Sequence, residues 1–270
     1  MRRRLIPAIA AIGYLSVHVP LLLLVLWSFN ASRSGARWDG FSFVWYQRLL
    51  ERADLLIALR TSLVVGLSAT LLATAFGTLA ALALARGRLR RAAWLEGSLA
   101  LSIVTPEVIA GISLLILFGA FGLPLGYLSL IVAHTAFALP FTILVVLARL
   151  RGMDETLEEA ALTLGADELT TFRRVTVPLL MPGIVGAALL AFTLSFDDFV
   201  ITFFTAGPGT STLPLLVYGM VRRTVEPSVN ALSAILVVVT TLLLLLAQKA
   251  LGVTRGAPGG AALERHTNSP

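Results

Sequence analysis

Four ionisable side chains, Glu107, His134, Asp197 and Asp198, fall inside stretches of sequence that are otherwise almost entirely apolar. If those stretches cross a membrane, a charge within them is costly and usually faces a cavity or a partner. Glu107 and Asp197 each lie fourteen residues into a predicted helix, counted from positions 93 and 183, or about 21 Å along it. His134 lies seven residues from the opposite end of its stretch, counted from position 127, or about 10 Å. We therefore expect the acids to form one level that a cation crosses, with His134 near it.

The two adjacent aspartates cannot both face one pathway, because neighbouring residues on a helix project about 100° apart. We expect one of Asp197 and Asp198 to face the substrate pathway. The other would cap a broken helix or pair with another subunit. Ser195 and Thr202 lie close in sequence and would supply neutral oxygens to a passing cation.

Glu107 and His134 each have a structural alternative. Glu107 follows Pro106, which removes a backbone donor and can open the helix, so the carboxylate could instead bond freed backbone groups. His134 suits an interhelical hydrogen-bonding role better than a proton relay. No Ser/His/Asp arrangement and no metal-ligand spacing is visible in the sequence. We therefore predict neither an enzyme nor a bound metal or other cofactor.

The composition indicates a polytopic membrane protein. Of its 270 residues 57% are hydrophobic and only 13% are charged, against about 25% charged in soluble domains. Cysteine is absent, which excludes disulfides and cysteine-based metal or redox sites. Lys249 is the single lysine and Ala250 follows it, so the chain has no phosphate-binding G-K-[ST] loop. If ATP drives this protein, another subunit must hydrolyse it.

Six apolar stretches are long enough to cross a bilayer, which takes about 20 residues. We predict an all-α membrane protein with six spans at 5–29, 61–85, 99–121, 127–148, 183–204 and 231–250. Residues 1–255 would form a single transmembrane domain. The first stretch would be retained as its first span, because it is too long for the core of a cleaved signal peptide. Residues 256–270 are rich in Gly, Pro and Ala and are predicted to be a disordered cytoplasmic tail.

The basic residues predict the orientation, because cytoplasmic loops carry an excess of Lys and Arg. With the N-terminus inside, the inner segments hold fourteen of the 21 basic residues and the outer segments hold seven. This bias favours both termini in the cytoplasm, and it also places residues 149–182 there.

Two outer segments contain structure of their own. Trp45, Leu49, Ala53 and Leu56 recur at helical spacing, so they predict one short helix that either lies on the outer surface or packs against the bundle. The apolar run 213–220 is too short to span, and we expect it to dip into the outer leaflet.

The long polar stretch 149–182 reads as two short helices joined by a glycine. Thr156 and Glu159 have the spacing of a capping box at the start of the first helix. Gly165 falls where a left-handed C-terminal cap is needed, and Asp167 can cap the second helix. Pro178, with Pro182 after it, is expected to end that helix.

The same stretch contains a spaced motif. Its members are Glu159-Ala160-Ala161, three residues, Gly165, nine residues, and Val175-x-Val177-Pro178. This resembles the "EAA" loop of the membrane subunits of ABC importers, E-A-A-x3-G-x9-I-x-L-P, with two valines in place of Ile and Leu. The resemblance implies that Glu159, Ala160, Ala161, Gly165 and Pro178 belong to a cytoplasmic coupling element that inserts into an ATPase subunit. The alternative is an ordinary helical hairpin.

Three further stretches are similar to the second membrane subunit of the spermidine/putrescine importer family. They are V-T-P-E-V-I-A-G-I-S-L at 104–114, A-H-T-A-F-A-L-P-F at 133–141 and F-T-L-S-F-D-D-F-V at 192–200. The resemblance implies the six-helix type I importer permease fold in a bacterial inner membrane. It also implies a sister permease subunit, an ATPase dimer and an extracytoplasmic substrate-binding protein as partners, and a polyamine as substrate.

Other functions stay open from the sequence alone. A permease of the same class could carry an amino-acid derivative, an opine or ferric iron. A secondary transporter or channel is disfavoured, because it has no ATPase to receive a coupling loop. A membrane-bound enzyme is disfavoured because no catalytic constellation is visible.

Overall fold

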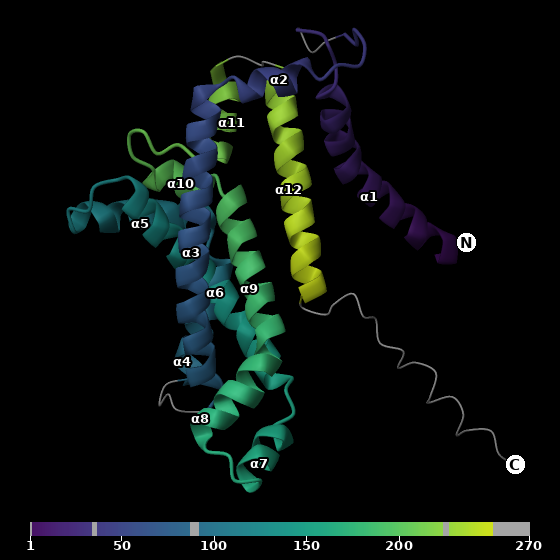
Figure 1. Cartoon of the computed structure of the whole chain (residues 1–270). Coiled ribbons are helices and arrows are strands. Elements are labelled where there is room, and N and C mark those ends of the chain that lie inside the picture. The colour runs from purple at the N-terminus through teal and green to yellow at the C-terminus, as the bar shows by residue number, and fades with distance from the viewer. Residues whose placement is uncertain (1, 34–36, 87–91, 224–226, 251–270) are drawn as a thin grey trace, which may run out of the picture. The chain divides into compact units, whose positions relative to one another are not determined.

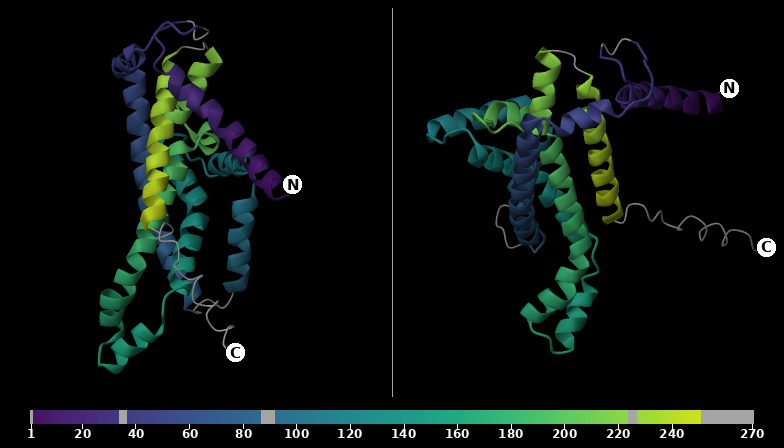
Figure 2. Two further views of the ribbon diagram at one scale, coloured as in Figure 1. Left: turned by 90° about the vertical axis from the view of Figure 1, so that its right-hand side faces the viewer. Right: turned by 45° about the horizontal axis from the view of Figure 1, so that its top comes forward.

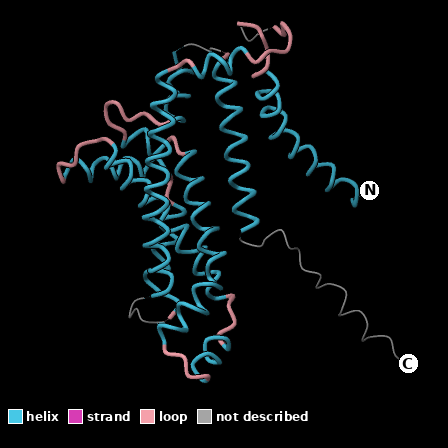
Figure 3. Tube along the Cα trace, in the orientation of Figure 1, coloured by secondary structure: helices cyan, strands magenta, loops and turns pink. Residues whose placement is uncertain are grey.

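The computed structural model describes residues 2–33, 37–86, 92–223 and 227–250, so the tail predicted for 256–270 lies outside the described residues. Within the described ranges the chain is helical apart from loops and one isolated bridge between Asn30 and Phe41 (Figures 1 and 3). The elements are α1 (Arg2–Trp27), α2 (Val44–Leu50), α3 (Ala53–Ala85), α4 (Ala92–Val104), α5 (Glu107–Ala120), α6 (Tyr127–Arg151), α7 (Thr156–Thr163), α8 (Glu168–Thr171), the π-helical turn η1 (Phe172–Thr176), α9 (Val177–Asp197), α10 (Val200–Thr205), α11 (Leu213–Arg223) and α12 (Ser228–Ala250).

Five helices of the described residues are long and apolar enough to cross a membrane, or six if the bent pair α4–α5 is one span. The stretches 61–85, 127–148 and 231–250 lie in α3, α6 and α12, and α3 begins eight residues earlier than its stretch. The stretch 5–29 runs two residues past the end of α1.

The third predicted span, 99–121, is not one continuous helix. Its two halves, α4 and α5, meet at a bend of 105° at Thr105 and Pro106. Pro106 has an extended ψ of 132°, lacks the N–H that a helix needs, and disfavours helical geometry in the residue before it. The bend therefore follows directly from the proline that the sequence contains.

The fifth predicted span, 183–204, is also interrupted, and its helix begins earlier than expected. A continuous helical segment runs from Glu168 to Asp197, and α10 follows after a break. The prediction that Pro178 and Pro182 end the helix is wrong. In η1 the N–H of Val177 bonds the carbonyl of Phe172. The backbone hydrogen bonds have therefore already shifted to the wider π-helical pattern when the chain reaches Pro178.

Contacts divide the chain into two units, each with its own core. Among the described residues, the first comprises those within 2–72, Val104–Ala138 and Phe192–Leu242, and the second comprises those within Ala73–Ile103, Leu139–Ala191 and 243–250. The core of the first unit includes Trp45, Leu49, Ala58, Phe196, Leu213, Val229 and Leu232. The core of the second includes Ala81, Leu84, Ile143, Val146, Leu180 and Ala187.

The single short helix predicted from Trp45 to Leu56 is wrong in its length. It is divided at Glu51 and Arg52, where α2 ends and α3 begins. Trp45 and Leu49 are 6% and 1% exposed, so α2 packs against the bundle rather than lying free on its surface. Trp45 Nε1 donates to the Asn30 carbonyl at 2.8 Å. The apolar run 213–220 forms part of α11.

In the second unit α3 and α6 approach closely at Gly77. The Thr142 hydroxyl of α6 donates to the carbonyl oxygens of Ala73 at 3.0 Å and of Leu139 at 2.8 Å. A Cβ added at Gly77 would overlap Thr142 Oγ1 and lie 3.0 Å from Thr142 Cβ. Because Thr142 is fully buried, it has no free space into which it can move.

We predict that Gly77→Ala destabilises the protein by about 1–3 kcal/mol, the usual cost of overpacking a filled core. Thermal unfolding of the purified protein in detergent would measure this as a lower Tm. Gly119→Ala is the matched control, since a Cβ at Gly119 would meet nothing within 4 Å. An unchanged Tm for Gly77→Ala would contradict the packing described.

Candidate functional site

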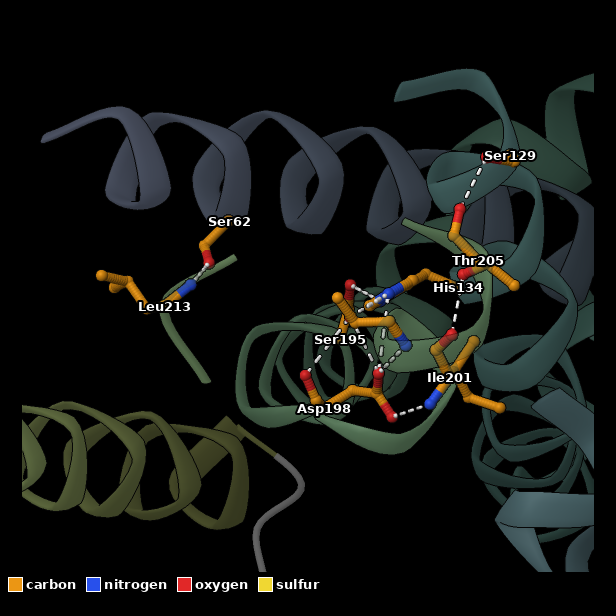
Figure 4. Close-up of polar contacts among 9 residues, drawn as sticks. Ser62, Ser129, His134, Ser195, Asp198, Ile201, Thr205 and Leu213 are labelled. Atoms are coloured by element: carbon orange, nitrogen blue, oxygen red, sulfur yellow. Dashed lines mark hydrogen bonds and ion pairs between the residues drawn. The ribbon is translucent and has the colours of Figure 1, made fainter. Parts of the chain in front are cut away.

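The break after α9 is organised by the carboxylate of Asp198. Its Oδ1 accepts from the N–H of Ile201 at 3.2 Å and its Oδ2 accepts from the N–H of Thr202 at 2.8 Å (Figure 4). The first N–H groups of a helix have no partner within that helix, so Asp198 satisfies two such donors of α10. This is the helix-capping alternative that the sequence left open for one of the two aspartates.

His134 of α6 joins this break from another helix. Its Nδ1 lies 2.7 Å from Ser195 Oγ and its Nε2 lies 3.0 Å from Thr202 Oγ1 (Figure 4). Thr202 Oγ1 also donates to Asp198 Oδ2 at 3.1 Å. Since the Thr202 hydroxyl has one hydrogen, Nε2 is the donor to Thr202 and Nδ1 accepts from Ser195. His134 thus links α6 to both α9 and α10, in the interhelical role that the sequence favoured.

The structure therefore brings together a serine, a histidine and an aspartate, which the sequence spacing did not reveal. Ser195 and His134 are 5% and 1% exposed. Asp198 Oδ2 lies 3.7 Å from His134 Nε2, beyond hydrogen-bond distance, and the Thr202 hydroxyl bonds to both. This arrangement holds helices in place and leaves no accessible nucleophile.

The other end of α10 is held by α6 as well. Ser129 Oγ donates to the carbonyl of Thr205 at 2.8 Å (Figure 4). It also accepts from the N–H of Gly126 at 2.7 Å, so it caps the start of α6. A Cβ at Gly207 would overlap the backbone of Leu125. Sequence reasoning missed Ser129, because its contact with Thr205 joins residues 76 positions apart.

Asp197 differs from its neighbour. It is the last residue of α9 and is exposed, and no hydrogen bond or ion pair joins it to another residue of the described part of the chain. Glu107, in the first turn of α5, is likewise exposed without such a partner among the described residues. The buried cluster therefore contains Asp198, His134, Ser195 and Thr202, whereas Asp197 and Glu107 are open to a ligand or another subunit.

In the second unit α7 and α8 fold back on each other as a hairpin, visible from two further sides in Figure 2. Gly165 has a φ of +91°. The N–H of Ala166 bonds the carbonyl of Ala161 at 3.1 Å, and that of Gly165 bonds Leu162 at 3.0 Å. This is a Schellman cap, as expected at Gly165.

The helix starts of the hairpin agree with the sequence in one case and not in the other. Asp167 Oδ1 accepts from the N–H of Thr170 at 3.2 Å, and hydrogen bonding from Thr170 holds the pKa of Asp167 below its usual value. The capping box predicted for Thr156 and Glu159 is wrong. Asp154 accepts instead from the Thr156 N–H at 3.0 Å and from the Thr156 hydroxyl at 2.7 Å. The Glu159 N–H bonds the Glu155 carbonyl at 3.2 Å rather than the Thr156 side chain.

Glu158, one residue before the motif glutamate, fastens the hairpin to the rest of its unit. Its Oε1 accepts from the Thr176 hydroxyl at 2.5 Å and lies 3.6 Å from Arg86 Nη2. The Arg86 guanidinium also lies 5.7 Å from the ring centre of Phe172. With Glu158 occupied in this way, the exposed Glu159 remains available to a partner.

The hairpin carries exposed leucines. Leu162, Leu164 and Leu169 are 46%, 89% and 55% exposed. Ala160 and Pro178 are exposed and Ala161 is half-buried. Exposed leucines and an exposed glutamate on one short hairpin are typical of a segment that another protein covers.

Comparisons with known proteins agree with these features. The chain is 40% identical over 235 residues to the spermidine/putrescine transport system permease protein PotC of Escherichia coli (strain K12), covering 87% of this chain and 89% of that protein. It is also 40% identical over 235 residues to the putrescine transport system permease protein PotI of the same strain, covering 84% of each. A PotC homolog of Mycoplasma pneumoniae is 32% identical over 248 residues, covering 85% of this chain and 84% of that protein.

Solved structures show the same fold at low identity. A bacterial ABC transporter involved in alginate import aligns with a TM-score of 0.69 and 16% identity, over 91% of this chain and 94% of that chain. The MetNI methionine ABC transporter aligns with a TM-score of 0.58 and 17% identity, over 76% and 100%. The predicted all-α importer permease fold is confirmed. Because residues 73–252 match the family described as "Binding-protein-dependent transport system inner membrane component", the chain belongs to that family of ABC importer membrane subunits.

Proposed function

We propose that this chain is the permease subunit through which an ATP-driven importer moves a polyamine, spermidine or putrescine, across the bacterial inner membrane. The observation that carries the proposal is the 40% identity to two polyamine permeases, over 84–89% of each protein. Identity at this level extends over both the break at Asp198 and the α7–α8 hairpin. The names of these two relatives favour a polyamine over an opine, an amino-acid derivative or ferric iron.

The partners follow from the same proposal. An ATPase dimer would receive the α7–α8 hairpin, whose exposed leucines and Glu159 suit a protein surface. A sister permease subunit would complete the pathway, and an extracytoplasmic binding protein would deliver the substrate. One solved relative in fold is an alginate ABC transporter in complex with its pentasaccharide-bound periplasmic protein. The positive-inside bias of the sequence supports a cytoplasmic location for both termini.

Within the pathway the two adjacent aspartates have different roles. Asp197, exposed and without a partner in the described residues, is the carboxylate that replaces part of the hydration of a passing ammonium group. Glu107 is exposed in the same unit and contributes a second charge. Asp198, His134 and Ser195 position the helices around the break rather than contact the substrate.

We predict that Asp197→Asn lowers polyamine uptake while the complex still assembles. A hydrogen bond to a charged group contributes about 1.5–3 kcal/mol, so uptake should fall about tenfold or more. Asp198→Ala should instead remove the cap of α10 and destabilise the protein by about 1 kcal/mol.

The measurement is uptake of radiolabelled putrescine or spermidine into vesicles, with Tm and co-purification of the partner subunits as controls. Wild-type uptake by Asp197→Asn would contradict its place in the pathway. A normal Tm for Asp198→Ala would contradict its structural role.

A second prediction concerns the hairpin. Gly165→Val should impair transport, because a β-branched residue at a φ of +91° is strained by about 1–3 kcal/mol. Gly165→Asn is the matched control, since asparagine tolerates the left-handed region. A Cβ at Gly165 would meet nothing within 4 Å, so any difference between the two variants reports the backbone and not a clash.

The readout is substrate imported per ATP hydrolysed by the reconstituted complex. We expect a lower ratio for the valine variant and a nearly normal ratio for the asparagine variant. Equal ratios for both variants and the wild type would show that the shape of the hairpin does not matter for coupling.

A further inference from the structure

The loop between α1 and α2 presents phenylalanine rings to its surroundings. Phe29 lies two residues beyond the end of α1, and its ring centre is 5.0 Å from that of Phe41 and 5.4 Å from that of Phe43. The ring centres of Phe41 and Phe43 are 5.2 Å apart. We name these three residues the aromatic platform. Phe41 and Phe43 are 65% and 55% exposed, so both rings present free surface although they pack against Phe29.

Backbone and side-chain hydrogen bonds hold the aromatic platform in a fixed shape. Asn30 is 1% exposed. Its Nδ2 donates to the carbonyl of Arg37 at 2.6 Å, and its Oδ1 accepts from the N–H of Asp39 at 2.9 Å. The N–H of Ser42 donates to the carbonyl of Phe29 at 2.7 Å. Exposed apolar rings that an ordered loop presents in this way indicate a surface that something else covers.

The level of the aromatic platform relative to the membrane follows from the length of α1. The candidate span Ile9–Trp27 has 19 residues, or about 28 Å of helix, which matches a hydrocarbon core of about 30 Å. Trp27 therefore lies at the edge of that core. Phe29 is two peptide units further on, so its Cα lies at most about 7.6 Å from that of Trp27. Since the headgroup region is about 5–7 Å deep on each side, the platform lies at its level.

The exposed apolar surface of α1 continues into this loop, at the end of α1 that is far from the N-terminus (Figure 1). The best apolar window of the span is 0% buried within the described chain, and Leu22 and Leu26 are 66% and 49% exposed. Trp38 of the loop is 41% exposed, and its ring centre lies 5.8 Å from that of Trp27. Aromatic side chains collect where hydrocarbon meets water, so a lipid surface can cover α1 and the loop together.

We propose that the aromatic platform and Trp38 lie in the headgroup region of the bilayer and are covered by lipid. The exposed rings of Phe41 and Phe43 carry no hydrogen-bonding group, and their surface is continuous with that of a membrane-spanning helix, so a lipid surface suits them better than a water-soluble partner. The loop is then unavailable to the substrate-binding protein. This inference goes beyond the proposed function and does not depend on which solute the protein carries.

Fluorescent labelling of single cysteines tests this location, because the chain contains no cysteine. Phe41→Cys and Phe43→Cys would each be labelled in the assembled complex in lipid nanodiscs, with the other subunits made cysteine-free. We expect a large loss of fluorescence with lipids that carry a nitroxide near the headgroup. The loss should be smaller with a nitroxide at the end of the acyl chain, and smaller again with iodide in water. Glu168→Cys, exposed on the polar hairpin, is the control, and neither nitroxide lipid should quench its label.

Quenching of both loop labels by iodide, without quenching by nitroxide lipids, would overturn the proposal. Protection from iodide that appears only when the substrate-binding protein is added would overturn it too, because that protein would then be the cover. Labels that neither iodide nor nitroxide lipids reach would place the platform against the sister subunit and would also contradict the proposal. Trp38→Cys supplies a third reporter if replacing a packed phenylalanine prevents assembly. Polyamine import is measured separately, so none of these outcomes decides the proposed function.

Discussion

The interaction on which the candidate pathway depends is the capping of α10 by Asp198. A helix that begins inside an apolar segment exposes N–H groups that water cannot satisfy, and here Asp198 accepts from the N–H groups of Ile201 and Thr202 at the start of α10. His134 then fastens the same threonine to α6 and Ser195. Because Asp198 and His134 both bond the Thr202 hydroxyl, the chain can break at this depth while α6 and α10 stay joined. The neighbouring Asp197, at the end of α9, remains exposed beside this break.

The second unit shows a corresponding division between residues that stabilise the hairpin and residues that remain exposed for a partner. Glu158 contacts Thr176 and Arg86, which keeps the α7–α8 hairpin in a fixed shape. The side chains of Glu159 and of the exposed leucines are left accessible to a partner. In both units one member of an adjacent acidic pair stabilises the fold, and its neighbour is left for a ligand or partner.

The helical permease fold and the family could be predicted from the sequence, because apolar length and the EAA spacing are local signals. The Gly165 cap and the Asp167 cap were predictable for the same reason. The exceptions come from tertiary context. The π-helical turn at η1 carries the helix through Pro178, and the contacts of Asp198 with α10 end the fifth apolar helix early. The contacts of Ser129 with Thr205, and of His134 with Ser195, join residues more than sixty positions apart, which no local pattern encodes.

Thiol accessibility tests the division between the two aspartates and their surroundings most directly, since the chain contains no cysteine. In a complex whose other subunits are made cysteine-free, the thiols of Asp197→Cys and of the near-isosteric Ser195→Cys would be exposed to a water-soluble, positively charged thiol reagent. The structure predicts that the Asp197→Cys thiol reacts quickly and is protected by polyamine, while the Ser195→Cys thiol, 5% exposed in its native form, does not react. Rapid reaction of the Ser195→Cys thiol, or an unreactive thiol at 197, would contradict a pathway lined by Asp197 and positioned by the buried network.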